Sequence, residues 1–377
     1  MFKIMLAVAI VVGAASARAQ RVPISYRQVR EGRQGEPLHA TQLLGDLGVL
    51  GGRIQTPTAR RFAPDSLWRR VWVVGADSAS DRFVEPRQLT VTGDLVVVLD
   101  LGTREVTGLD ALSGKSRFLL KPRGQGPGEF MRPARIAATP NGFAIVDHNS
   151  ARITAYDRNA KPLWDAVIPD VFSIDGLCVR NGRIVTKQQR RDSSIVEYDT
   201  TGHRVATQSV PWKTIAPGGP SFAYMGYLSD ASPNGDCVVA PIFGGEFAVA
   251  SASGAARVFA VTEPKPNAEV KVAEHTLDRS LTSTTVQSVQ QSDTKHASRG
   301  AMIRGDTAII YAADTKESPM RLLDYYDIRS GAYLYSRKLP FIAVSLSVGA
   351  DGTFYATSIG ADASAVVAIR PERPKAR

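Results

Sequence analysis

The sequence predicts an all-β protein, a six-bladed β-propeller of four-stranded antiparallel blades whose last blade is closed by the N-terminal strand. The first observation behind this prediction is a unit that occurs six times, an apolar run, a glycine-centred turn and a second apolar run. Tight hairpins need positive φ at the turn, so this unit predicts a β-hairpin. The six turns are Gly93-Asp94, Asn141-Gly142, Asn181-Gly182, Asn234-Gly235-Asp236, Gly305-Asp306 and Asp351-Gly352.

A second hairpin follows the first in most repeats. It is an apolar strand that ends in an aromatic residue or Leu followed by Asp, then a turn and another strand. The copies end at Asp110, Asp157, Asp199 and Asp327. Two hairpins within about 45 residues give four antiparallel strands, which is the content of one propeller blade.

An alignment between two repeats predicts how the ring closes. Phe83-Val84-Glu85-Pro86 matches Phe130-Met131-Arg132-Pro133, and each lies between an outer strand and the next inner strand. Val71–Val74 precedes the first copy and therefore has the register of an outer strand, yet it has no blade of its own. The last repeat, Val344–Ile369, has room for three strands. We expect Val71–Val74 to complete that blade, because this leaves no open sheet edge at the seam.

The first 19 residues are typical of a secretory signal peptide. Lys3 precedes the apolar run Ile4–Val12, and Ala17-Arg18-Ala19 offers a small-x-small cleavage site before Gln20. The run is too short to span a bilayer, and no other stretch is long and apolar enough to do so. The sequence therefore predicts an exported protein, periplasmic or extracellular, without a membrane span.

The mature chain divides into an arm, a propeller and a tail. Residues 20–66 are rich in Arg and Gly and are expected to be extended or partly disordered, with a short helix near Thr41 as the alternative. The propeller is expected over 67–371 and the tail over 372–377. A polar insertion at about 265–295 is expected to be a protruding loop, because it has no hairpin glycine and no paired apolar run.

One blade boundary resembles an NHL repeat. Residues 124–133 read Gly-Gln-Gly-Pro-Gly-Glu-Phe-Met-Arg-Pro, and the pattern continues at Ile136, Gly142, Asp147, Asn149, Arg152-Ile153 and Tyr156-Asp157. The resemblance implies a six-bladed propeller with a central channel, in the wider group that includes bacterial exported members of unknown role. It implies no single function, since such propellers serve as ligand sensors, as RNA or protein binders and occasionally as lyases.

The same residues also have a structural interpretation. Phe130 is suited to pack between blades, and Asp147 and Arg152 are spaced to pair across the turn between the second and third strands.

The chain has two cysteines, Cys178 and Cys237. They either form a disulfide or remain buried thiols.

A net charge of +10 and a pI of about 9.7 favour an anionic partner, although a solvated basic surface is the alternative. Loops at the channel mouth are the usual ligand site of a propeller, and most of the candidate residues there are basic. The candidates for ligand binding are Arg104, Glu129, Arg132, Arg135, His148, Asn149, Arg190, Arg191 and Lys316.

These features favour a non-catalytic binding or scaffolding module for a protein, a peptide or an anionic glycan. Nucleic acid is a weaker match, because the chain is exported and its aromatic residues are not interleaved with Arg. No cofactor and no catalytic residue is predicted.

The alternative is a metal-dependent hydrolase or lyase, lactonase-like or amidating-lyase-like, with its site at the channel mouth. Calcium is the metal that Glu85, Glu129, Asp147 and Asn149 would suit. The five histidines are scattered without zinc-type spacing, and no Gly-x-Ser-x-Gly motif is present.

Overall fold

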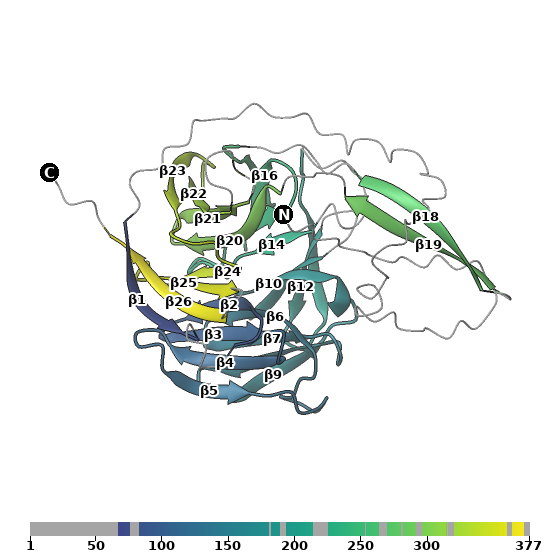
Figure 1. Cartoon of the computed structure of the whole chain (residues 1–377), viewed down its shortest axis with the longest axis horizontal. Helices are drawn as coiled ribbons and strands as arrows, with labels where there is room; N and C mark the ends of the chain where they lie inside the picture. The colour runs from purple at the N-terminus through teal and green to yellow at the C-terminus, as the bar shows by residue number, and fades with distance from the viewer. Residues whose placement is uncertain are drawn as a thin grey trace, which may run out of the picture. The chain divides into compact units, whose positions relative to one another are not determined.

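A computed structural model shows six four-stranded antiparallel sheets arranged in a ring, so the predicted six-bladed β-propeller is confirmed (Figure 1). Each sheet is one blade. The structure describes residues 67–75, 83–180, 182–188, 194–213, 225–252, 254–263, 270–279, 282–291, 296–313, 315, 320–359 and 364–372.

The first three blades follow one another along the chain, each beginning with its innermost strand. Blade 1 is β2 (Pro86–Thr92), β3 (Leu95–Asp100), β4 (Glu105–Asp110) and β5 (Ser116–Leu120). Blade 2 is β6 (Pro133–Thr139), β7 (Gly142–Asp147), β8 (Arg152–Asp157) and β9 (Pro162–Val167). A 3-10 turn, η1 (Val171–Ser173), leads into blade 3, which is β10 (Ile174–Arg180), β11 (Arg183–Gln188), β12 (Ser194–Asp199) and β13 (Arg204–Ser209).

The last three blades repeat the pattern until the seam. Blade 4 is β14 (Gly226–Leu228), β15 (Cys237–Pro241), β16 (Glu246–Ala250) and β17 (Arg257–Ala260). Blade 5 is β20 (Ser298–Arg304), β21 (Thr307–Ala312), β22 (Leu322–Asp327) and β23 (Tyr333–Lys338). Blade 6 is β24 (Ser345–Val348), β25 (Phe354–Ile359), β26 (Ser364–Pro371) and β1 (Trp68–Val74).

The insertion contains two strands where the sequence predicted a protruding loop. β18 (Val270–Arg279) and β19 (Thr282–Gln291) pair with each other as an antiparallel hairpin and belong to a second compact unit. The prediction relied on a glycine turn, and residues 265–295 contain no glycine. The β-branched Thr and Val residues of both strands favour extended backbone and account for the hairpin.

The N-terminal strand closes the ring as predicted. β1 pairs with β26 in antiparallel register, with Val73 opposite Val367 and Val74 opposite Val366. A register shift between Arg70 and Trp72 marks a β-bulge. Because side chains alternate along a strand, one extra residue moves the following side chains to the other face.

This bulge lets the two tryptophans of β1 reach both neighbouring blades. Trp68 packs edge-on against Phe354, with ring centroids 5.4 Å apart, in the core between blades 5 and 6. The indole N–H of Trp72 donates to the carbonyl oxygen of Ala111 at 2.9 Å, and the ring lies in the core between blades 6 and 1. The closing strand therefore stabilises both contacts of the last blade.

The hydrophobic core lies between blades. Every residue of β3 and β7 is buried, and each of the six clusters of buried apolar side chains draws from two adjacent blades. Phe130 lies in the cluster between blades 1 and 2, where its sequence pattern placed it. Since burying one large aliphatic side chain contributes about 1.5–3 kcal/mol, the packing between blades is the main stabilising term.

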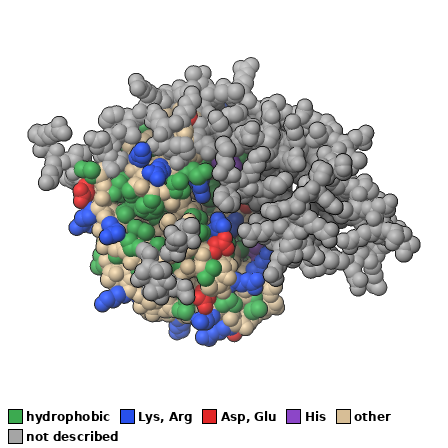
Figure 2. Space-filling model, viewed as in Figure 1, with side chains coloured by type: hydrophobic (Ala, Val, Ile, Leu, Met, Phe, Trp, Pro, Cys, Tyr) green, Lys and Arg blue, Asp and Glu red, His purple; other side chains and the backbone are tan. Residues whose placement is uncertain are grey.

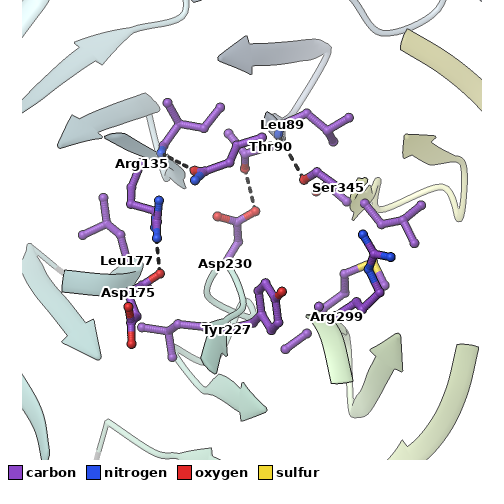
Figure 3. Close-up of a pocket in the computed structure, with 18 of the residues that line it drawn as sticks. Leu89, Thr90, Arg135, Asp175, Leu177, Tyr227, Asp230, Arg299 and Ser345 are labelled. Carbon is purple, nitrogen blue, oxygen red and sulfur yellow. Dashed lines mark hydrogen bonds between the residues drawn. The ribbon is translucent and has the colours of Figure 1, made fainter. Parts of the chain in front are cut away.

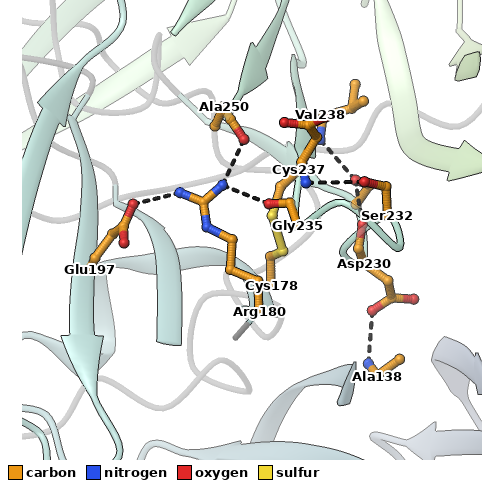
Figure 4. Close-up of a disulfide and its surroundings, with 12 residues drawn as sticks. Ala138, Cys178, Arg180, Glu197, Asp230, Ser232, Gly235, Cys237, Val238 and Ala250 are labelled. Carbon is orange, nitrogen blue, oxygen red and sulfur yellow. Dashed lines mark hydrogen bonds and ion pairs between the residues drawn. A yellow bond between two sulfur atoms is a disulfide. The ribbon is translucent and has the colours of Figure 1, made fainter. Parts of the chain in front are cut away.

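Blades 3 and 4 are also joined by a disulfide and an arginine (Figure 4). Cys178 and Cys237 are bonded, which resolves the alternative that the sequence left open. Arg180 is 2% exposed and donates to the carbonyl oxygens of Gly235 and Ala250 at 2.8 and 2.7 Å. A cross-link across 59 residues stabilises the fold by about 4 kcal/mol in the chain-entropy picture.

Replacing Trp72 with Ala is expected to lower the free energy of unfolding by about 3–5 kcal/mol. The substitution removes a buried indole and its hydrogen bond from the seam. Urea unfolding of the purified protein measures the change. Leu112→Ala is the control, because Leu112 is 75% exposed and its loss should change stability by less than about 0.5 kcal/mol. Equal effects of the two substitutions would contradict the role of Trp72.

Candidate functional site

The innermost strands of all six blades surround a cavity on the propeller axis (Figure 3). Its volume is about 370 Å³, within the range of small-molecule sites. Aliphatic side chains form much of its wall, and a few charged or polar groups enter between them. The charged and phenolic residues of the lining are Arg87, Arg135, Asp175, Tyr227, Asp230 and Arg299.

β-bulges place several of these groups. The register shifts after the first residue of β2, β6, β10 and β20, so the second residue of each strand is the extra one. In three of these strands the extra residue is Arg87, Asp175 or Arg299, and all three line the cavity. A bulge re-aims a side chain that a regular strand would direct elsewhere, which explains why charged groups reach the axis here.

Two arginines of the cavity have no carboxylate partner among the described residues. Arg135 donates from Nε to the carbonyl oxygen of Asp175 at 2.9 Å and from Nη1 to that of Ala134 at 2.8 Å. The Nη1 of Arg299 donates to the sulfur of Met320 at 2.8 Å. The described hydrogen-bond acceptors of both guanidiniums are therefore neutral groups.

The third arginine is different. Arg87 is exposed and pairs with Glu85 at 2.5 Å. Its charge is therefore compensated on the surface, where such pairs contribute about 1 kcal/mol or less.

Tyr227 supplies a hydroxyl to the cavity. Burial raises the pKa of this phenol, and the nearby positive charges of Arg299 and Arg135 lower it in part. The hydroxyl therefore stays protonated at neutral pH and can donate a hydrogen bond. Figure 3 shows the ring beside Arg299 at the cavity wall.

Asp230 reaches across the axis from blade 4 to blades 1 and 2. One carboxyl oxygen accepts from the hydroxyl of Thr90 at 2.6 Å, and the other accepts from the backbone N–H of Ala138 at 2.8 Å. Burial raises the pKa of this carboxyl, and the two hydrogen bonds lower it in part. One side chain from the segment after β14 thus ties the inner strands β2 and β6 together, and it lies near the centre of the channel in Figure 3.

A buried ion pair forms part of the wall at blade 3. Lys187 and Asp175 lie 3.6 Å apart from Nζ to Oδ2, and the lysine side chain is 1% exposed. A Cβ on Gly226 would approach the Cε of Lys187 to 3.1 Å and the Ala240 carbonyl oxygen to 2.7 Å. The glycine is therefore needed for the close approach of β14 to this lysine, and the ion pair itself joins β10 and β11 within blade 3.

The structure brings together three of the residues predicted from sequence. Arg135 lines the cavity, and His148 lies near it and donates its backbone N–H to the carbonyl oxygen of Arg132 at 3.1 Å. Burial, followed by the charges of Arg135 and Arg132, lowers the pKa of His148 to about 4, so the imidazole is neutral at physiological pH. Its ring packs 5.2 Å from that of the exposed Phe172, and Nε2 is buried without a hydrogen-bond partner among the described residues.

The other predicted residues have different positions. Glu129 accepts from the backbone N–H of Gly126 within its own loop, and Arg104 is exposed in the β3–β4 turn with a φ of 61°. Asn149 is exposed beside His148. Arg190, Arg191 and Lys316 lie outside the described residues.

The aspartate of the NHL-like stretch organises a loop. Asp147 accepts from the backbone N–H groups of Met131, Arg132 and Asn149 and from the hydroxyl of Ser150. Asp147 and Arg152 are partners in the register of β7 and β8, as predicted, but the Arg152 guanidinium donates to the carbonyl oxygen of Gln125 at 3.2 Å. The backbone donors to Asp147 hold the crossing loop to the second strand.

The carboxylates considered for calcium are engaged elsewhere. Asp147 binds its loop, Glu129 binds Gly126, and Glu85 pairs with Arg87. Within the described ranges, no three His, Cys, Asp or Glu side chains gather in a way that would hold a metal ion.

Sequence reasoning missed most of the cavity. Tyr227, Asp230 and Arg299 were not selected, nor was the pair formed by Asp175 and Lys187. One signal in the sequence could have revealed cavity residues. Arg87 follows Pro86 at the bulge of its strand, and Asp175 and Arg299 occupy the same bulged position in their strands. Those blades do not keep the Phe-x-x-Pro sequence, so the alignment that revealed the closure does not extend to them.

Solved structures share the propeller fold. A member of the DUF4221 family from Bacteroides vulgatus has a TM-score of 0.50 at 10% identity, covering 84% of this chain and 99% of that one. A putative exported protein from Bacteroides fragilis has a TM-score of 0.47 at 10% identity, covering 82% and 95%. At such identity the likeness shows the fold alone.

No protein-family model and no curated protein matches the sequence. In the described part of the chain, no helix has the length and apolar character that crossing a bilayer requires.

The Asp230→Asn variant is expected to lose part of the pH dependence of stability. Because the folded-state pKa is raised, the folded protein holds this proton more tightly than the unfolded chain does. Its stabilising effect is complete below about pH 4 and declines as the pH rises through the folded-state pKa. Asn keeps an acceptor for Ala138 without a charge.

Chemical denaturation between pH 4 and pH 8 tests this expectation. The free energy of unfolding of the wild type minus that of Asp230→Asn should fall as the pH rises. Asp170→Asn, an exposed site, provides the matched control. A difference that stays constant across this range would contradict the assignment.

Proposed function

We propose that the protein is an exported, non-catalytic binding propeller that holds an anionic partner at the mouth of its central channel. The observation that carries this proposal is the pair of channel arginines, Arg135 and Arg299, whose described partners are carbonyl oxygens and a thioether. A guanidinium in a partly buried site is stabilised by an anion, and its planar fork suits carboxylate, sulfate or phosphate groups.

The rim of the channel extends the positive charge. Arg132 is exposed, and it lies close enough to His148 to lower the pKa of that imidazole together with Arg135. Figure 2 shows Lys and Arg side chains at several separate places on the described surface, so the net charge alone marks no site. The arginines at the axis differ from these because they converge on a cavity.

Three further observations support a binding role. The signal-like leader supports export, where acidic glycans and acidic peptides are available partners. The NHL-like stretch resembles propellers that bind ligands. The carboxylates that calcium chemistry would use already hold the loops of the fold. The partner class is therefore a protein, a peptide or a glycan that carries negative charge.

Changing Arg132 to Glu is expected to weaken binding to heparin roughly tenfold. The reversal replaces an attraction of about 0.5–1 kcal/mol with a repulsion of similar size. Binding of the mature protein to heparin at low salt measures the effect. Arg204→Glu is the matched control, because Arg204 is an exposed arginine on the outer strand β13. Failure of the wild type to bind heparin, or equal binding by both variants, would contradict the proposal.

A further inference from the structure

We propose that the channel cavity is a subsite for a carboxylate carried on a short apolar body, with the carboxylate held by Arg299 and the Tyr227 hydroxyl. This inference rests on the proposed function and deepens it, because it names the group of the anionic partner that enters the channel.

The first argument is charge. Arg299 lies on β20 beside the Tyr227 ring in Figure 3, whereas Arg135 lies at the opposite wall, where its Nε donates to the carbonyl oxygen of Asp175. The Arg299 guanidinium retains donors beyond its contact with Met320, since Arg has five N–H groups and one is used here. One cation and one neutral donor suit a carboxylate, which accepts several hydrogen bonds at once.

The second argument is the wall. Leu177, Leu228, Ile303, Leu346 and Val348 line the cavity. A sugar ring needs free polar groups along its body, whereas these residues offer apolar contact. The apolar lining therefore favours an aliphatic or aromatic body over a glycan unit.

The polar side chains of the cavity wall also favour an apolar ligand body over a sugar, because they already form hydrogen bonds within the protein. Gln88 already donates to the Ala134 carbonyl oxygen and accepts from the backbone N–H of Ile136. Thr90 donates to Asp230, and Ser345 accepts from the backbone N–H of Leu89. These contacts hold the inner strands together and leave few polar groups for a sugar.

The third argument is size and direction. At about 30 Å³ for each water-sized group, a cavity of about 370 Å³ holds on the order of ten non-hydrogen atoms. The Asp230 carboxyl also lines it, bonded to Thr90 and Ala138. A ligand carboxylate would be repelled there and beside Asp175, which also lines the cavity next to Arg135, so the charged end belongs at Arg299 and the apolar body along the wall.

This chemistry has two sources, a free small acid and the C-terminal residue of a peptide. 4-Methylpentanoate represents the first, and N-acetyl-Ala-Ala-Leu with a free C-terminus represents the second. The uncharged matches are 4-methylpentanamide and the C-terminally amidated peptide.

Calorimetric titration of the mature protein at pH 7 with these four compounds tests the proposal. At least one acid should bind, and its amide should bind at least about tenfold more weakly, because a charge-assisted hydrogen bond contributes about 1.5–3 kcal/mol. If the small acid binds, the natural ligand of the cavity is a free small acid. If only the peptide binds, the natural ligand is the C-terminal residue of a peptide. No binding by either acid, or equal binding by acid and amide, would overturn the proposal.

Variants locate the binding. Arg299→Gln should weaken acid binding at least about tenfold, and Arg299→Lys should restore part of it by returning the charge without the fork. Tyr227→Phe should weaken it severalfold. Arg204→Gln is the control, because Arg204 is exposed on the outer strand β13. Circular dichroism confirms folding, and unchanged affinity in both folded Arg299→Gln and Tyr227→Phe would overturn the assignment.

The heparin measurement separates this inference from the proposed function. Heparin binding without acid binding would overturn the proposed carboxylate subsite but would still support an anionic partner at the channel mouth. Acid binding without heparin binding would support the subsite and contradict the wider cationic mouth. Arg132→Glu should impair heparin binding while leaving acid binding within about threefold, since Arg132 is not among the residues that line the cavity.

Discussion

Packing between blades is the interaction on which the rest of this structure depends. A blade of four short strands buries both faces only when it has a neighbour on each side, as the fully buried strands β3 and β7 show. An open ring would expose two apolar blade faces and an unpaired edge at the seam. Closure by β1 prevents this, and the bulge in β1 is what lets Trp68 and Trp72 serve opposite faces of the last blade.

The closed ring then fixes the geometry of the axis. Six inner strands meet around one cavity, and bulges near their starts aim Arg87, Asp175 and Arg299 toward it. The disulfide and Arg180 hold blades 3 and 4 together beside strands that carry cavity residues. A rigid wall matters for binding, because groups that are already positioned lose little entropy when a ligand arrives.

Most of the fold could be predicted from the sequence, because each blade is formed by residues that are close together along the chain. Six glycine turns predicted the blades, and one Phe-x-x-Pro alignment predicted the strand that closes the ring. The hairpin β18–β19 was missed because its signal is β-branched composition without a glycine turn. The pairing of Cys178 with Cys237 stayed open because spacing alone does not show that β10 and β15 lie face to face.

The site was harder to predict because it is made by long-range contacts. Asp230 meets Thr90 across 140 residues and Ala138 across 92, and no local pattern encodes such a meeting. Arg135 lies two residues after the matched Pro133, whereas Arg299 follows a serine and Tyr227 lies on the shortest inner strand. Asp147 was correctly seen as structural, but its partners are backbone amides that spacing does not reveal.

Cross-linking of β1 to β26 tests the central claim of closure most directly. In the Val73→Cys, Val367→Cys double variant the new cysteines stand directly opposite one another, at the distance that a disulfide spans. Mild oxidation of the folded protein, followed by proteolysis and mass spectrometry, should give one linked pair of peptides containing residues 73 and 367. A Val73→Cys, Val205→Cys control, with the second cysteine on β13, should give none. Absence of the 73–367 link, or a link in the control, would contradict a ring closed by its N-terminal strand.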